Sequence, residues 1–126
     1  MDLSSIKKKI RFLEGQRQRN LTYLLNPKDM VAGSIYTVYK KCGNKKCRCA
    51  RGKPHGPFYY LSRKVDGVTK LTFVRRADEE EVEEKAYNYR KYIKAMADLT
   101  KIDKKIYGYL KKIKEEKTEG YGNRKV

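Results

Sequence analysis

Three cysteines and one histidine lie within fourteen residues of one another, and the chain of 126 residues has no other residue of either type. They follow the spacing C-x4-C-x-C-x5-H and are Cys42, Cys47, Cys49 and His55. Three thiolates and one imidazole form a ligand set that holds Zn²⁺ in a tetrahedral structural site. Glycine and proline between these residues favour the turns that such a loop needs. We therefore predict a Zn²⁺ ion bound by four side chains, which leave it no open position for catalysis.

Two other interpretations of the cysteines stay open. The spacing differs from that of common zinc fingers, so the residues could be reduced surface thiols beside a histidine in a turn. A redox switch is less favoured, because the usual C-x-x-C arrangement is absent. An odd number of cysteines in one cluster argues against a disulfide framework. We expect a soluble cytoplasmic protein that binds no membrane, because the sequence has neither an apolar run of ~18 residues nor a signal peptide.

Basic side chains are concentrated in the same part of the chain. The sequence has 32 Lys and Arg against 15 Asp and Glu, a net charge of +17, and residues 40–76 contain twelve cations but a single acid, Asp66. This concentration is typical of phosphate contacts, and the aromatic rings interleaved with it can stack on unpaired bases. The alternative is a solvated rim around core aromatic rings. We predict nucleic-acid contacts for Lys45, Lys46, Arg48, Arg51, Lys53, Arg63, Lys64, Lys70, Arg76, Tyr36 and Tyr60.

A period of two between polar and apolar residues predicts three strands, at 33–41, 56–65 and 68–76. Asp66-Gly67 predicts a two-residue hairpin between the last two. By alternation, one face of the sheet would carry Ile35, Tyr39, Tyr59, Leu61, Leu71 and Phe73. The other face, which we expect a ligand to meet, would carry Tyr36, Lys40, Phe58, Tyr60, Lys64, Lys70 and Arg76.

Two helices are predicted on either side of these strands. Residues 4–25 place apolar side chains at three- and four-residue intervals, the spacing of a coiled-coil seam, except that Arg17 occupies one seam position. Residues 78–115 are predicted to form a longer helix, with Asp78 as its N-cap and Glu81 completing a capping box. A helix of this length needs a partner, and the first helix is the natural one.

The predicted fold is α+β, in a single domain over residues 1–126. It comprises an N-terminal helix, a three-stranded antiparallel sheet with the Cys₃His zinc loop over 33–76, and a long C-terminal helix. The two helices pack as an antiparallel, coiled-coil-like pair, and the surplus length of the second is available for a homodimer. Residues 116–126 hold few apolar side chains, which predicts a mobile tail.

The segment from Gly33 to Lys64 resembles the signature of an uncharacterised family of short archaeal and bacterial proteins, in which C-G-x3-C-x-C is followed by H-G-P-x-Y-Y-L-S-R. The resemblance is carried by Cys42, Gly43, Cys47, Cys49, His55, Gly56, Pro57, Tyr59, Tyr60, Leu61, Ser62 and Arg63. It implies that the loop and the following hairpin form one unit, and that the protein is associated with viruses or mobile elements. It implies no activity.

Catalysis finds little support in the sequence. One histidine cannot form a relay with a second, the acids of residues 78–84 suit the start of a helix, and no phosphate-binding glycine loop or nucleophile elbow is present. We expect a zinc-stabilised protein that is not an enzyme and that binds nucleic acid, with DNA favoured over RNA, and duplex DNA with modest sequence preference. The alternative is a protein-interaction module, a helical hairpin that dimerises or inhibits an acidic partner, such as a viral protein acting on a host nuclease.

Overall fold

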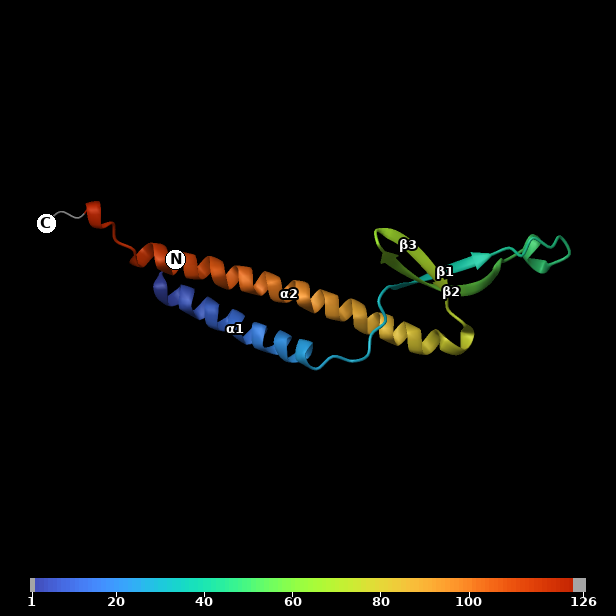
Figure 1. Ribbon diagram of the computed structural model, residues 1–126, viewed down its shortest axis with the longest axis horizontal. Helices are drawn as coiled ribbons and strands as arrows, with labels where there is room; N and C mark the ends of the chain where they lie inside the picture. The colour runs from blue at the N-terminus through green and yellow to red at the C-terminus, as the bar shows by residue number, and fades with distance from the viewer. Residues whose placement is uncertain (1, 124–126) are drawn as a thin grey trace. The chain divides into compact units, whose positions relative to one another are not determined.

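The computed structural model describes residues 2–123, and its element order confirms the predicted α+β fold (Figure 1). An N-terminal helix precedes a three-stranded sheet and a long C-terminal helix. The helices and strands are α1 (Leu3–Leu25), β1 (Ser34–Lys40), β2 (His55–Val65), β3 (Val68–Phe73) and α2 (Glu79–Lys117). Three single 3₁₀ turns, η1, η2 and η3, occupy Arg48–Ala50, Arg76–Asp78 and Tyr121–Asn123.

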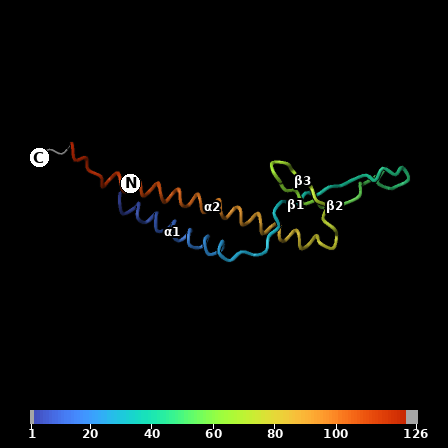
Figure 2. Tube along the Cα trace, viewed as in Figure 1, coloured from blue at the N-terminus to red at the C-terminus, as the bar shows by residue number. Residues whose placement is uncertain are grey.

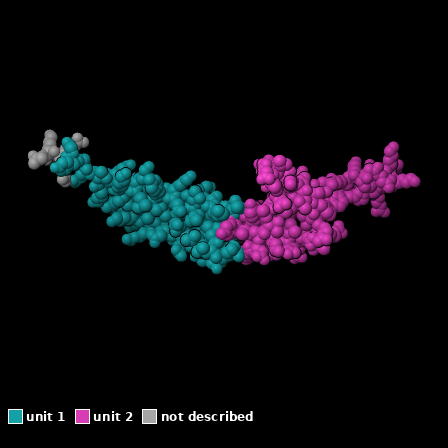
Figure 3. All heavy atoms as spheres, viewed as in Figure 1, with its two compact units in different colours: residues 1–27, 93–126 teal, residues 28–92 magenta. Residues whose placement is uncertain are grey.

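The described chain divides into two compact units, and α2 contributes to both (Figure 3). Residues 1–27 and 93–126 form the first unit, and residues 28–92 form the second. The predicted mobile tail, 116–126, begins inside α2, which ends at Lys117, and continues into η3. Its last three residues lie outside the described part of the chain.

In the first unit, α1 runs antiparallel to the C-terminal part of α2 (Figure 2). Contacts of Arg17 with Asp103 and of Lys9 with Tyr109 set this direction, because residue numbers rise along one helix as they fall along the other. The seam of α1 is buried, as predicted, at Ile6, Leu13 and Leu24. On α2, half-buried side chains recur every three or four residues at Ala95, Leu99, Ile102, Ile106, Tyr109 and Ile113.

Polar side chains begin and end α1. The carboxylate of Asp2, the N-cap residue, accepts a hydrogen bond of 2.7 Å from the backbone N–H of Ser5, which satisfies one of the free donors of the first turn. At the other end, the backbone N–H of Asn26 donates to the carbonyl of Tyr23 at 3.2 Å. The side-chain amide of Asn26 donates to the carbonyl of Thr22 at 2.8 Å. The helix therefore ends at Leu25, the predicted last residue.

In the second unit, the strands form an antiparallel sheet in the order β1-β2-β3. The hairpin between β2 and β3 closes with the pair Val65–Val68, so that Asp66 and Gly67 are its two loop residues, as predicted. Both have positive φ, 52° and 79°, which is the requirement of a type I′ turn.

The predicted face assignment of β3 is wrong. Tyr60 pairs with Phe73, Ser62 with Leu71 and Arg63 with Lys70, so Leu71 and Phe73 share the face of Tyr60, and Lys70 lies on the opposite face. The two-residue loop is the physical reason, because pairing Val65 with Val68 places even-numbered residues of β2 beside odd-numbered residues of β3. Within β1 and β2 the predicted alternation agrees with the pairing of residues 34–38 with residues 58–62, and the register then shifts between Val38 and Lys40. The parity between β2 and β3 was misassigned.

The predicted third strand also continues too far. It ends at Phe73, after which the backbone N–H of Val74 donates to the carbonyl of Tyr59 at 2.8 Å. Arg76 then lies in the 3₁₀ turn η2 and not on the sheet. Asp78, the predicted N-cap of the long helix, lies in the same turn, and its carboxylate accepts a hydrogen bond of 3.1 Å from Nε of Arg75.

The core of the second unit lies where the segments flanking the sheet meet the first turns of α2. Val74 and Ala86 are 5% and 1% exposed. The backbone N–H of Val31 donates to the carbonyl of Lys85 at 3.1 Å, and the side-chain amide of Asn88 donates to the carbonyl of Asp29 at 3.1 Å. These bonds hold the chain that enters β1 against α2.

Candidate metal centre and basic surface

The four predicted zinc ligands come together at the end of the sheet in the second unit. One ligand atom from each of Cys42, Cys47, Cys49 and His55 lies within 4.8 Å of the other three. The Sγ atoms of Cys42 and Cys49 are 3.5 Å apart, and Sγ of Cys47 lies 3.1 Å from Nε2 of His55. A tetrahedral zinc site with bonds of ~2.3 Å to sulfur has sulfur–sulfur edges of roughly 3.8 Å, so the cluster fits the ion.

The strand ends and η1 position these ligands. Cys42 follows β1 by two residues, and His55 is the first residue of β2, where it pairs with Lys40. Cys47 precedes η1, and its carbonyl accepts a hydrogen bond of 3.1 Å from the N–H of Ala50. Cys49 lies inside the turn. The fourteen residues 41–54 connect β1 to β2, and the three thiols of this connection thus lie close to the end of the strand pair.

Backbone polar groups fix the first part of this connection. The carbonyl of Asn44 accepts a hydrogen bond of 3.0 Å from the N–H of Cys47, and its side-chain oxygen accepts one of 2.9 Å from the N–H of Lys46. Gly43 has a φ of 82°, a conformation that a side chain disfavours. The loop is therefore ordered by its own hydrogen bonds as well as by the cluster.

The thiols have unequal surroundings. The backbone N–H of Asn44 holds the pKa of Cys42 below its ordinary value, and the thiols of Cys49 and Cys47 act in the same direction. Cys49 is 2% exposed. The backbone N–H of Cys42 favours its thiolate, but burial and the neighbouring thiols outweigh this bond and raise the pKa of Cys49. The Cys42 thiol is therefore easier to ionise than an ordinary thiol, and the Cys49 thiol is harder to ionise.

The predicted nucleic-acid contacts are exposed, apart from the half-buried Tyr60, but they do not share one face. We define the basic loop as residues 41–54, which contain six cations and no acid. Five predicted contacts lie in this loop, and all are exposed: Lys45, Lys46, Arg48, Arg51 and Lys53. On the sheet, Tyr36, Tyr60 and Lys64 lie on one face, and Arg63 and Lys70 lie on the other. Arg76 lies in η2, apart from either face.

The sequence interpretation missed two members of the Tyr60 face. Leu71 and Phe73 are 54% and 52% exposed on it. The two-residue hairpin signal at Asp66-Gly67 could have placed both, because the length of the loop fixes the parity of the strands that it joins.

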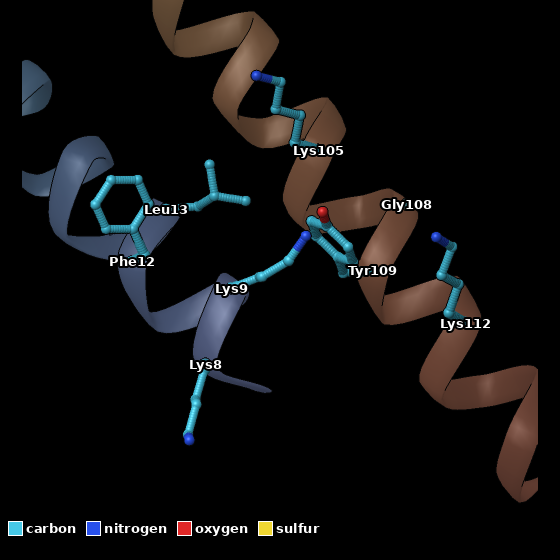
Figure 4. Close-up of a pocket in the computed structure, with 8 residues that line it drawn as sticks. All are labelled: Lys8, Lys9, Phe12, Leu13, Lys105, Gly108, Tyr109 and Lys112. Carbon is cyan, nitrogen blue, oxygen red and sulfur yellow. The ribbon is translucent and has the colours of Figure 1, made fainter. Parts of the chain in front are cut away.

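A second cationic feature lies in the first unit, between α1 and α2 (Figure 4). It is a groove of about 590 Å³, lined by Lys8, Lys9, Phe12, Leu13, Lys105, Gly108, Tyr109 and Lys112. The ammonium groups of Lys9 and Lys112 lie 5.9 and 5.3 Å from the centre of the Tyr109 ring. The groove therefore joins an apolar floor to four positive charges. None of the helices within residues 2–123 is long and apolar enough to cross a membrane.

The family profile of a domain of unknown function (DUF6788) covers residues 4–84, which include α1 from its second residue, the metal cluster, the whole sheet and the start of α2. No curated protein and no solved structure matches the chain.

Proposed function

Because the chain belongs to the family of a domain of unknown function (DUF6788), we propose a function from its site: a zinc-stabilised protein that binds nucleic acid through the basic loop. The observation that carries the proposal is the coincidence of the metal cluster with the exposed cations. Arg48 lies between two of the zinc ligands, and Arg51 and Lys53 lie between the last cysteine and the histidine.

Zinc supplies a fixed backbone in this proposal and takes no part in a reaction. Four protein ligands fill a tetrahedral ion, so that the ion acts only as a cross-link. A cross-linked loop presents its cations at fixed positions, which lowers the entropy lost when they contact phosphates. Positive charge without interspersed acid favours a polyanion over ligands of mixed charge.

Phosphate contacts of this kind bind duplex DNA with little sequence preference, because the phosphate backbone is the same at every step. We propose duplex DNA as the principal form, with DNA favoured over RNA, in a protein that is cytoplasmic and not an enzyme. The resemblance to proteins of viruses and mobile elements is consistent with such a role.

The test is a titration of a fluorescent 20-base-pair duplex across a salt series. We expect the affinity to fall steeply with salt, and the double substitution Arg48→Glu with Arg51→Glu to reduce the slope of log affinity against log salt by about 2 or more. Lys94→Glu with Lys104→Glu is the matched control, because it changes the net charge equally on exposed positions of α2. Equal losses in the two variants would show that net charge alone binds DNA, and would refute the role of the loop.

The groove of the first unit favours a second candidate function. Four lysines around Leu13 and Tyr109 suit an acidic amphipathic helix, which would place apolar side chains on the floor and carboxylates at the rim. The exposed apolar side chains Met96 and Leu110 of α2 suit a homodimer. Competition with bulk DNA separates the candidates, because a protein partner bound in the groove would lose little affinity to it.

A further inference from the structure

Three aromatic residues form a row across the whole sheet. Tyr36 of β1 pairs with Tyr60 of β2, and Tyr60 pairs with Phe73 of β3. Residues that pair directly project from the same face, and neighbouring strands are ~4.8 Å apart, so the three rings lie side by side. The rings of Tyr60 and Phe73 meet edge to face, with centroids 5.5 Å apart.

The row faces outward. Tyr36 and Phe73 are 56% and 52% exposed, and Tyr60 between them is half-buried. The buried side chains of this unit include Val74 and Ala86, which lie outside the sheet. Leu71 continues the apolar surface at 54% exposure. The rings of the row therefore lie outside the core of the second unit, on an open face where a ligand can contact them.

Cations accompany the row. The ammonium group of Lys40 donates to the hydroxyl of Tyr60 at 2.5 Å and lies 4.8 Å from the centre of its ring. Lys64 pairs with Thr69 and thus projects from the same face. The three strands contain no Asp or Glu, so no carboxylate of the sheet repels an anion there. Flat rings beside phosphate-binding cations are the combination that binds single-stranded nucleic acid.

We propose that the row of Tyr36, Tyr60 and Phe73 stacks on unpaired bases, so that the protein binds single-stranded nucleic acid, or the single-stranded part of a junction, on this face. The inference rests on the proposed function and deepens it, because it adds base stacking to the phosphate contacts of the basic loop. Bases inside a duplex are stacked on one another and cannot reach the rings. The row therefore distinguishes open from paired strands, whereas the loop does not.

The experiment compares a 15-nucleotide single strand with the duplex of the same sequence, for the wild-type protein and for Tyr36→Leu with Phe73→Leu. Leucine keeps an apolar side chain on the strand but removes the flat ring. We expect the affinity for the single strand to fall by about fivefold or more for each ring removed, with the affinity for the duplex unchanged. Tyr87→Leu is the control, because it removes a ring of similar exposure, 51%, from α2 and not from the sheet.

A second measurement needs no variant. The single strand carries 2-aminopurine, whose fluorescence reports stacking, and we expect a change on binding to the wild-type protein. An unchanged fluorescence, or a variant that binds the single strand as tightly as wild type, would overturn the proposal. The proposal would also be overturned if the variant lost self-association, measured by sedimentation, while it kept its affinity for the single strand. That result would mean that a second copy of the chain covers this face.

The outcomes separate this inference from the proposed function. If the wild-type protein binds duplex but no single strand, only the inference fails. If it binds neither, with zinc present and the fold intact by circular dichroism, the proposed function fails as well. Arg48→Glu with Arg51→Glu is expected to weaken the binding of both the duplex and the single strand. The ring variant is expected to weaken the binding of the single strand alone.

Discussion

Arg17 of α1 is joined to Asp103 of α2 by an ion pair of 2.7 Å between Nε and Oδ1. Arg17 stands at the seam position where the repeat of the helix calls for an apolar side chain, and the structure shows the charge paired across the two helices. Both side chains are partly exposed, 41% and 47%, so water screens the pair. Its contribution to stability is expected to be no more than about 1 kcal/mol.

Replacing Arg17 with leucine should therefore stabilise the helical pair. The substitution Arg17→Leu restores the apolar repeat, and we expect the free energy of unfolding to rise by roughly 0.5–1 kcal/mol, because burial of leucine exceeds the loss of a screened ion pair. The measurement is urea unfolding followed by circular dichroism at 222 nm. Asp103→Ala alone is the control and should destabilise slightly. A large loss in Arg17→Leu would mean that the pair, and not the seam, specifies the helix alignment.

Removing the most buried zinc ligand should release the metal. We expect Cys49→Ser to weaken zinc binding by more than roughly 100-fold, since a serine hydroxyl is a poor ligand and the site is closed by four protein ligands. Zinc content by mass spectrometry and a competing chelator measure the loss. Ala50→Ser, one residue further on in the same turn, is the matched control and should keep one zinc per chain. Equal zinc content in both variants would show that the cluster is not the site.

Zinc affinity should rise with pH. Binding displaces protons from the thiols, and the raised pKa of Cys49 means that its proton is held to a higher pH than in a free thiol. The lowered pKa of Cys42 means that this thiol loses its proton at a lower pH than an ordinary thiol. We expect the apparent affinity to increase steadily from about pH 6 to pH 9. Chelator competition at each pH measures it, and an affinity independent of pH would exclude thiolate ligands.

The N-cap of α1 should make the stability of the protein fall at acidic pH. The hydrogen bond from the N–H of Ser5 lowers the pKa of Asp2 in the folded state. The stabilisation from this hydrogen bond is therefore fully present above the pKa that Asp2 has in the unfolded chain. It is lost as the pH falls through the lower pKa that Asp2 has in the folded protein. We expect Asp2→Asn to keep the cap but remove this pH dependence, and Asp2→Ala to lower the melting temperature at neutral pH by a few degrees. Thermal unfolding between pH 2 and pH 7 compares them. Parallel pH profiles for Asp2→Asn and the wild type would contradict the assignment.

Two glycines should respond to alanine with opposite signs. An added Cβ meets nothing within 4 Å at Gly67 or at Gly108. The effect of alanine on stability therefore depends only on the backbone conformation at each position. At Gly67, where φ is 79°, alanine should cost about 1–2 kcal/mol. At Gly108, inside α2, it should stabilise by about 1 kcal/mol. Chemical unfolding of Gly67→Ala and Gly108→Ala measures both, and a neutral Gly67→Ala would argue against the tight hairpin.

Much of this architecture follows from local patterns. The seam of α1, the hairpin at Asp66-Gly67 and the grouping of three cysteines with a histidine each depend on residues close in sequence, so each could be predicted. The faces of β3 depend on a relationship between strands, which the alternation within a single strand does not contain. For that reason Lys70 was assigned to the wrong face and Phe73 was left out of the row that it completes.

The end of β3 could not be predicted for a related reason. Residues 68–76 contain no glycine, proline, asparagine or aspartate that would mark an earlier end of the strand. In the structure Val74 is buried in the core, although its N–H still bonds to the carbonyl of Tyr59 in the preceding strand. The strand ends where the chain turns towards η2 and α2, and this turn depends on the packing of Val74 in the core. The exposed row of aromatic rings likewise depends on which face the rest of the unit leaves open.

Three ligands of the cluster lie in the basic loop and the fourth, His55, directly follows it, so metal and polyanion would act on the same segment of the chain. If the loop binds nucleic acid better when zinc fixes it, thermodynamic reciprocity requires that nucleic acid raise the affinity for zinc by the same factor. A chelator would then remove the ion more slowly, or less completely, from the complex than from the free protein. Such a protein would retain its zinc where nucleic acid is abundant and release it where nucleic acid is scarce.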